Sequence, residues 1–166
     1  EWEGIPIIDA HLHLGEDLDG SSCGEDELLR LMDDNHIRQG LVLPFNETDA
    51  DDNFLSVARK NLSLKERYPD RILCGFRIDP KKEFQKTVDF AREHQIPVMK
   101  LHPTSQGFKI TSPRLHDLLD ELLGARYRPL IFVHTDIIPE EGTGCEMLNC
   151  PKDVMQVARS YPDLCF

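Results

Sequence analysis

The sequence predicts an α/β protein built on a parallel β-sheet, and two observations predict it. Short apolar runs rich in β-branched residues recur along the chain, and amphipathic segments with apolar residues at helical spacing lie between them. Strands that alternate with helices are typical of βαβ units and therefore of a parallel sheet. No linker or low-complexity segment divides the 166 residues, so we expect a single domain, 1–166.

The expected elements follow one another in a regular order along the chain. Apolar runs predict strands at residues 5–8, 40–43, 72–76, 96–99 and 130–133, and the start of a sixth strand at 164–166. Helical spacing predicts helices at 25–35, 53–68, 82–94, from 113 onward and at 151–160. Pro113 directly after Ser112 is typical of a helix start, because proline fits the first helical turn.

Two architectures are compatible with this order of elements. A five-stranded doubly wound sheet is complete at this length, whereas an eight-stranded (β/α)8 barrel of the TIM type needs about 250 residues. On the barrel interpretation the chain holds five βα units and the start of strand six. The residues at the strand ends distinguish the two architectures.

Charge and composition exclude several classes of partner. The chain carries 19 Lys and Arg against 30 Asp and Glu, a formal net charge of −11, so we expect no nucleic-acid partner. No apolar stretch approaches the roughly 18 residues of a membrane span and no leader sequence is evident, so we expect no membrane partner. Five cysteines without a CxxC pair predict reduced thiols in a cytoplasmic protein, with a metal or redox role for Cys145 and Cys150 as the alternative.

Four of the seven histidines stand at the carboxyl ends of expected strands. Strand one runs into Asp9, His11 and His13, which alternation places on one face. Strand four ends in His102 and strand five in His134. An isolated HxH motif is more often a pair of solvated loop histidines, but α/β folds build their sites at this end of the sheet.

Three of these imidazoles, those of His11, His13 and His134, would give a divalent cation an open set of nitrogen ligands. Such a set is typical of a catalytic zinc site, and Zn²⁺ is the leading candidate. Mn²⁺, Fe²⁺, Co²⁺ or Ni²⁺ would also accept imidazole ligands. We assign no role to the remaining histidines, which are His36, His94 and His116.

The strand-end motifs resemble those of the amidohydrolase superfamily. They are DAHLH at 9–13, KLHP at 100–103 and VHT at 133–135, in the family's order, and 99–108 is similar to the amidohydrolase-related branch. That branch includes hydrolases and decarboxylases of the aminocarboxymuconate-semialdehyde type. The resemblance implies a (β/α)8 barrel with His11, His13 and His134 as metal ligands. It also implies a histidine after strand six and an aspartate after strand eight, neither of which lies within the 166 residues.

Lys100 and His102 are candidate catalytic residues, and Arg77 is a candidate for substrate binding. Some superfamily members carboxylate a strand-four lysine to bridge two metals, but we favour Lys100 as a cation that holds an anionic substrate or pairs with a carboxylate. His102 is either a donor or general acid, or a structural histidine. Arg77 either binds a substrate carboxylate or, as we favour, forms an ion pair near Asp79.

We therefore expect a metal-dependent hydrolase that activates water against a small carbonyl, ester or amide substrate. A metal-dependent decarboxylase on the same scaffold is the first alternative. A non-catalytic half-barrel is the second, because open strand edges favour self-association into a homo-oligomer. The loop 136–149 is long for a βα connection, and we expect it to cover the pocket.

Overall fold

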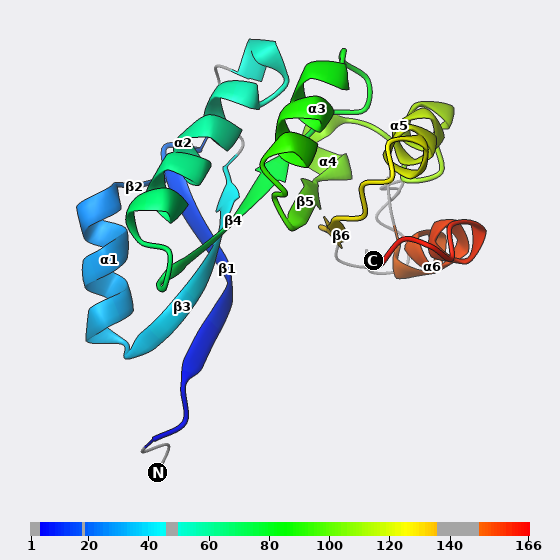
Figure 1. Ribbon diagram of the computed structural model, residues 1–166. Helices are drawn as coiled ribbons and strands as arrows, with labels where there is room; N and C mark the ends of the chain where they lie inside the picture. The colour runs from blue at the N-terminus through cyan, green and yellow to red at the C-terminus, as the bar shows by residue number, and fades with distance from the viewer. Residues whose placement is uncertain (1–3, 18, 46–49, 136–149) are drawn as a thin grey trace, which may run out of the picture. The chain divides into compact units, whose positions relative to one another are not determined.

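The computed structural model describes residues 4–17, 19–45, 50–135 and 150–166 (Figure 1). The chain divides into two compact units, Glu1–Arg77 and Ile78–Phe166. Each unit is described by itself below.

The first unit is a small sheet covered by two helices. Its elements are β1 (Ile7–Glu16), β2 (Ser22–Cys23), α1 (Glu25–Asp34), β3 (Ile37–Pro44), a 3₁₀ turn (Ala50–Asp52), α2 (Leu55–Arg67) and β4 (Ile72–Arg77). The strand order is β2-β1-β3-β4, in which β2 pairs antiparallel with β1 and the other neighbours are parallel. The parallel arrangement confirms the βαβ units expected from the alternating pattern.

Both helices of this unit pack on the same side of the sheet. A single core cluster draws Leu28 and Met32 from α1, Leu64 from α2, and residues of three strands, which are Leu14, Val42 and Ile72. Leu28 and Met32 are four residues apart and therefore lie on one face of α1. Three carboxylates in the first turn of α1 also favour that helix, because the amino-terminal end of a helix carries partial positive charge.

The second unit contains two paired strands and four helices in its described part. Its elements are α3 (Gln85–Glu93), β5 (Val98–Leu101), α4 (Pro103–Gln106), α5 (Pro113–Gly124), β6 (Leu130–Val133) and α6 (Pro151–Ser160). β5 and β6 pair in parallel over four consecutive residue pairs. The expected sixth strand is present as a single parallel bridge between Leu130 and Cys165.

Helix α5 shows why the sequence pattern predicts this unit well. Its stripe of Leu115, Leu118, Leu119 and Leu122 is fully buried. The helix ends where Arg126 adopts a left-handed conformation with φ of 54°. There the N–H groups of Arg126 and Tyr127 donate to carbonyls of the last turn, those of Leu123 and Leu122, which is a Schellman termination.

The structure adds three short elements that the sequence does not predict, β2, the 3₁₀ turn and α4. Two, three and four residues are too few for a periodicity to be recognised. The cysteines within the described ranges, which are Cys23, Cys74, Cys150 and Cys165, carry free thiols, whereas Cys145 lies outside those ranges. Among the described residues, no helix is both long and apolar enough to cross a membrane.

Candidate functional site

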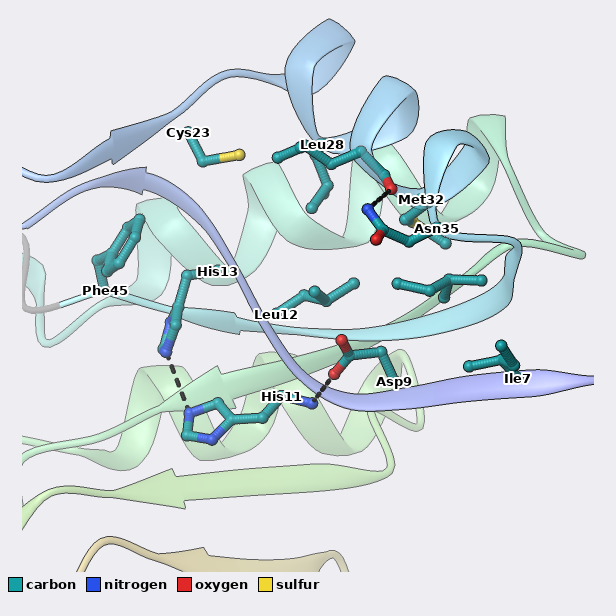
Figure 2. Close-up of a pocket in the computed structure, with 12 residues that line it drawn as sticks. Ile7, Asp9, His11, Leu12, His13, Cys23, Leu28, Met32, Asn35 and Phe45 are labelled. Carbon is teal, nitrogen blue, oxygen red and sulfur yellow. Dashed lines mark hydrogen bonds between the residues drawn. The ribbon is translucent and has the colours of Figure 1, made fainter.

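The imidazoles of His11 and His13 lie together at the carboxyl-terminal half of β1. Their Nε2 atoms are 3.1 Å apart, and their ring centroids are separated by 4.8 Å (Figure 2). Two nitrogen ligands at normal distances from one divalent cation are themselves about 2.9 to 3.4 Å apart, depending on the coordination angle. The separation of the two Nε2 atoms therefore fits a shared cation.

A one-residue irregularity in β1 lies beside this pair of histidines. Asp9 pairs with Gly40, but Leu12 pairs with Val42, so β1 advances three residues while β3 advances two. The extra residue breaks the expected alternation between Asp9 and the histidines. The Asp9 carboxylate instead accepts a hydrogen bond from the main-chain N–H of His11, at 2.9 Å. The expectation that Asp9 shares a face with the two imidazoles is thus wrong, and the bulge is the reason.

The tautomer of His13 is set by its surroundings. Its Nδ1 lies 3.1 Å from the carbonyl oxygen of Leu43, a group that only accepts hydrogen bonds. Nδ1 therefore carries the proton, and the lone pair of the neutral ring is on Nε2, the atom that faces His11. The ring of Phe45 stacks on His13 at 4.5 Å and holds its plane. Sequence reasoning did not identify Phe45, because an aromatic residue just after a strand is usually part of the core.

A cavity of about 590 Å³ lies beside this pair (Figure 2). Its polar end holds Asp9, His11 and His13, and side chains of α1, among them Leu28 and Met32, form an apolar wall. Cys23 also lines the cavity, but burial, and secondarily the charge of Glu27, raise the pKa of its thiol. The Cys23 Sγ donates a weak hydrogen bond to the carbonyl oxygen of Gly24 at 3.6 Å.

In the second unit, His102 and His134 stack face to face. Their ring centroids are 3.9 Å apart and their planes differ by 12°. The main-chain N–H of His134 donates to the carbonyl of Leu101 at 3.0 Å, which extends the pairing of β5 with β6 by one residue. Both histidines therefore stand where the sequence places them, at the carboxyl ends of neighbouring parallel strands.

His102 also begins the short helix α4, and this role defines its protonation. Its Nδ1 accepts a hydrogen bond from the main-chain N–H of Ser105 at 3.4 Å, so the proton of the neutral ring is on Nε2. Gln106, which is buried, accepts from the N–H of His102 and donates to the carbonyl of Ile78, both at 2.8 Å. Gln106 thus anchors the strand-four motif, a role with no signal in the sequence.

The two cationic candidates are both buried against aromatic rings. The Lys100 ammonium lies 4.7 Å from the ring centroid of Phe132, its partner across the β5–β6 pair. The Arg77 guanidinium lies 5.1 Å from the ring centroid of Phe54. Each is only 2% exposed, and an aromatic face attracts a cation, so these contacts stabilise the charged side chains inside the protein.

Four of the predicted site residues thus form two pairs, one in each unit. His11 and His13 are the first pair, and His102 and His134 are the second. Lys100 contacts Phe132 and Arg77 contacts Phe54 instead. Across residues 4–17, 19–45, 50–135 and 150–166, no group of three His, Cys, Asp or Glu side chains gathers to hold a metal ion. The three-imidazole centre therefore stays a prediction, and the expected covering loop 136–149 lies outside the described residues.

Comparisons with known proteins identify the fold. No protein-family model matches the sequence, and no curated protein sequence matches it. Solved structures do match. A 5-carboxyvanillate decarboxylase from Novosphingobium aromaticivorans, solved with bound manganese, superposes with a TM-score of 0.65 at 13% identity, over 99% of this chain and 66% of that one.

Two further structures give the same result. A candidate amidohydrolase from Staphylococcus aureus matches with a TM-score of 0.63 at 9% identity, over 96% of this chain and 65% of that chain. A 2,6-dihydroxybenzoate decarboxylase from Rhizobium matches with a TM-score of 0.61 at 13% identity, over 96% and 64% of the two chains. The chain spans between 49% and 66% of the length of the structures it matches. The chain therefore has an α/β fold of βα units that matches part of the TIM barrels of these structures, which confirms the barrel rather than the doubly wound sheet.

Proposed function

We propose that the chain supplies the amino-terminal βα units of a metal-dependent hydrolase of the amidohydrolase type. The observation that carries this proposal is the pair of Nε2 atoms of His11 and His13, 3.1 Å apart. The hydrogen bond from His13 Nδ1 to Leu43 directs the Nε2 lone pair at His11 Nε2, and a bound cation would replace the hydrogen bond that joins the two Nε2 atoms. Two solvated loop histidines are not expected to have a fixed tautomer or to direct their Nε2 atoms at one point.

His11, His13 and His134 are the proposed ligands of one divalent cation. Zn²⁺ is the first candidate because it favours imidazole nitrogen, and Mn²⁺, Fe²⁺, Co²⁺ and Ni²⁺ are alternatives. The manganese in the matching 5-carboxyvanillate decarboxylase supports a divalent cation on this fold. When bound, such a cation supplies Lewis acidity that activates water and polarises a carbonyl group.

The remaining candidates would bind the substrate and move protons. His102 keeps a proton on Nε2, because its Nδ1 accepts from Ser105, and it is therefore a hydrogen-bond donor or general acid toward a substrate oxygen. Lys100 and Arg77 are buried cations, and we assign them to holding an anionic group of the substrate. The substrate is a small molecule with a carbonyl, ester or amide group.

Decarboxylation is the second candidate function. The matching structures include decarboxylases that act on 5-carboxyvanillate and 2,6-dihydroxybenzoate, which are aromatic acids. Two buried cations, Lys100 and Arg77, would suit a substrate carboxylate in either reaction. The two functions differ in the product, which is a hydrolysed bond in one and CO₂ in the other.

Metal binding tests the ligand assignment. We expect His134→Ala to lower the affinity for Zn²⁺ by at least about 100-fold, because one of three protein ligands is lost. His94→Ala is the matched control, since His94 lies at the carboxyl-terminal end of α3 and is assigned no role. Equilibrium dialysis followed by elemental analysis measures both variants. Equal zinc content in the two would contradict the proposed ligand set.

A substrate panel tests the reaction. The protein, as a chain that includes these 166 residues, is supplied with zinc or manganese and assayed on small esters, amides, lactones and aromatic carboxylic acids. Hydrolysis that is lost in His13→Ala supports the hydrolase, and CO₂ release lost in the same variant supports the decarboxylase. Turnover of either kind that persists in His13→Ala would show that the proposed centre does not carry it.

A further inference from the structure

A second cavity in the Ile78–Phe166 unit is lined by cations and by no carboxylate. Its volume is about 420 Å³, and its lining includes Lys81, Lys109, Arg114, Thr111, Ser112 and Phe108. The chain as a whole has 30 acidic residues against 19 basic ones. The lining of this cavity has three basic side chains and no acidic one. Its charge is therefore positive, although the net charge of the protein is negative.

The charges in this cavity are available to a ligand. Within the described ranges, neither the Lys81 nor the Lys109 ammonium lies within ion-pair distance of a carboxylate. Arg114 has one ion pair, with Asp117 at 3.8 Å, and both side chains of that pair are more than half exposed. An exposed pair at this distance contributes little, so Arg114 can turn to a stronger anionic partner.

The helix α5 starts at the wall of the cavity and presents an unused hydroxyl group there. Ser112 occupies the N-cap position, but its side chain makes no capping hydrogen bond. Its Oγ is buried and has no hydrogen-bond partner among the described residues. A buried hydroxyl without a partner costs free energy, and a hydrogen bond to another group would remove that cost. A change of the Ser112 χ1 rotamer would direct this hydroxyl to an anion in the cavity, and that anion would also face the positive end of a 12-residue helix.

The position of Lys81 is set by its own loop. The Asp79 carboxylate accepts a hydrogen bond from the main-chain N–H of Lys81 at 3.0 Å, which fixes the turn. Gly107 has a φ of +63°, and a Cβ atom there would lie 3.5 Å from the Lys81 Nζ. The Lys81 ammonium therefore lies next to the backbone of Gly107, and both residues line the cavity.

We propose that this cavity binds the phosphate group of a small organic phosphate. Three cations and two hydroxyl-bearing residues match a phosphate monoester, which carries between one and two negative charges and three acceptor oxygens. A carboxylate, with one charge and two oxygens, would use only part of this set. Phe108 and Pro113 in the lining would contact the apolar body of the ligand. The site includes none of the proposed metal ligands, so it does not rest on the proposed function.

Phenyl phosphate is the probe that tests this proposal. It is titrated into the protein by calorimetry at low ionic strength in the presence of a metal chelator, which removes binding to any metal. Inorganic phosphate and benzoate are titrated in parallel, since the first lacks the apolar body and the second lacks the phosphate. We expect saturable binding of phenyl phosphate that is tighter than that of either comparison compound.

Three variants assign the binding to the cavity. Lys81→Gln and Lys109→Gln should each weaken phenyl phosphate binding about tenfold, the usual effect of one lost charged hydrogen bond. Lys86→Gln, an equal change of charge on the exposed surface of α3, should leave it unchanged. The proposal is overturned if phenyl phosphate does not bind, if benzoate binds as tightly, or if Lys86→Gln weakens binding as much as the cavity variants do.

Discussion

The two parallel strand pairs that carry the candidate residues differ in regularity. In the second unit, β5 and β6 pair residue by residue, and Lys100 lies directly opposite Phe132. In the first unit, the pairing of β1 with β3 slips twice, once between Ile7 and Ile8 and once between Asp9 and Leu12. Alternation predicts the facing of side chains in the regular pair and fails across the slip, because one extra residue inverts every facing that precedes it.

The irregular pair is also the one whose strand β1 carries two imidazoles with their Nε2 atoms 3.1 Å apart. Leu12 and Gly40 explain how the chain accommodates the slip. A Cβ atom on Gly40 would lie only 2.3 Å from the Leu12 Cδ1, so the absence of a side chain at this position makes room for Leu12. A glycine inside a strand often marks such a close approach.

The largest expected effect is therefore that of Gly40→Ala. The added methyl group overlaps the end of the Leu12 side chain, which packs against the core cluster of the first unit, so we expect a loss of up to about 3 kcal/mol in the free energy of unfolding. Urea denaturation followed by circular dichroism measures the change. Gly124→Ala is the control, because no atom lies within 4 Å of the point that its added methyl group would occupy and alanine favours the helix α5. Similar stability changes in both variants would contradict the close approach of Leu12.

Alkaline pH should weaken the first unit through Cys74, which lies on β4 and pairs with Val42. Burial raises the pKa of this thiol from 9.0 to about 11. The unfolded chain releases the proton at the lower pH, so this contribution is complete below about pH 9 and is lost as the pH rises toward 11. We expect a loss of about 2 kcal/mol near the upper limit. Denaturation at several pH values measures it, and Cys74→Ala should remove this part of the pH dependence. An unchanged pH dependence in that variant would refute the assignment.

The regular pair can be tested through the contact between Lys100 and Phe132. A double-mutant cycle of Lys100→Met and Phe132→Leu should give a coupling energy of about 1 kcal/mol, the usual size of a buried cation–π contact. Chemical denaturation of the four proteins measures it. Additive effects would show that the ammonium does not interact with the ring.

The smallest effect is expected at the end of α5, and it is a gain. Arg126 has a φ of 54°, which costs a residue other than glycine free energy. Arg126→Gly should therefore raise the free energy of unfolding by up to about 1 kcal/mol, measured as an increase in thermal stability. Arg126→Ala keeps the strained backbone and should not stabilise. A gain of equal size in both variants would assign the effect to the arginine side chain instead.

The same contrast shows how far the sequence determines the fold and the site. The leucine stripe of α5 and the strand at Leu130–Val133 can be predicted from the sequence, because a helical stripe of leucines and a short continuous apolar run are both clear local signals. The bulge in β1 could not be predicted, since it depends on the space that Gly40 leaves for Leu12. Gln106 and Phe45 were also missed, because a hydrogen bond to a strand end and a ring stacked on His13 depend on tertiary contacts.

We propose that His11, His13 and His134 bind one divalent cation. X-ray absorption spectroscopy of the zinc-loaded protein tests it most directly, because imidazole ligands give a characteristic scattering pattern that can be counted. We expect three imidazoles on zinc in the unaltered protein and two in His134→Ala. A spectrum without imidazole scattering, or one that His134→Ala leaves unchanged, would contradict it.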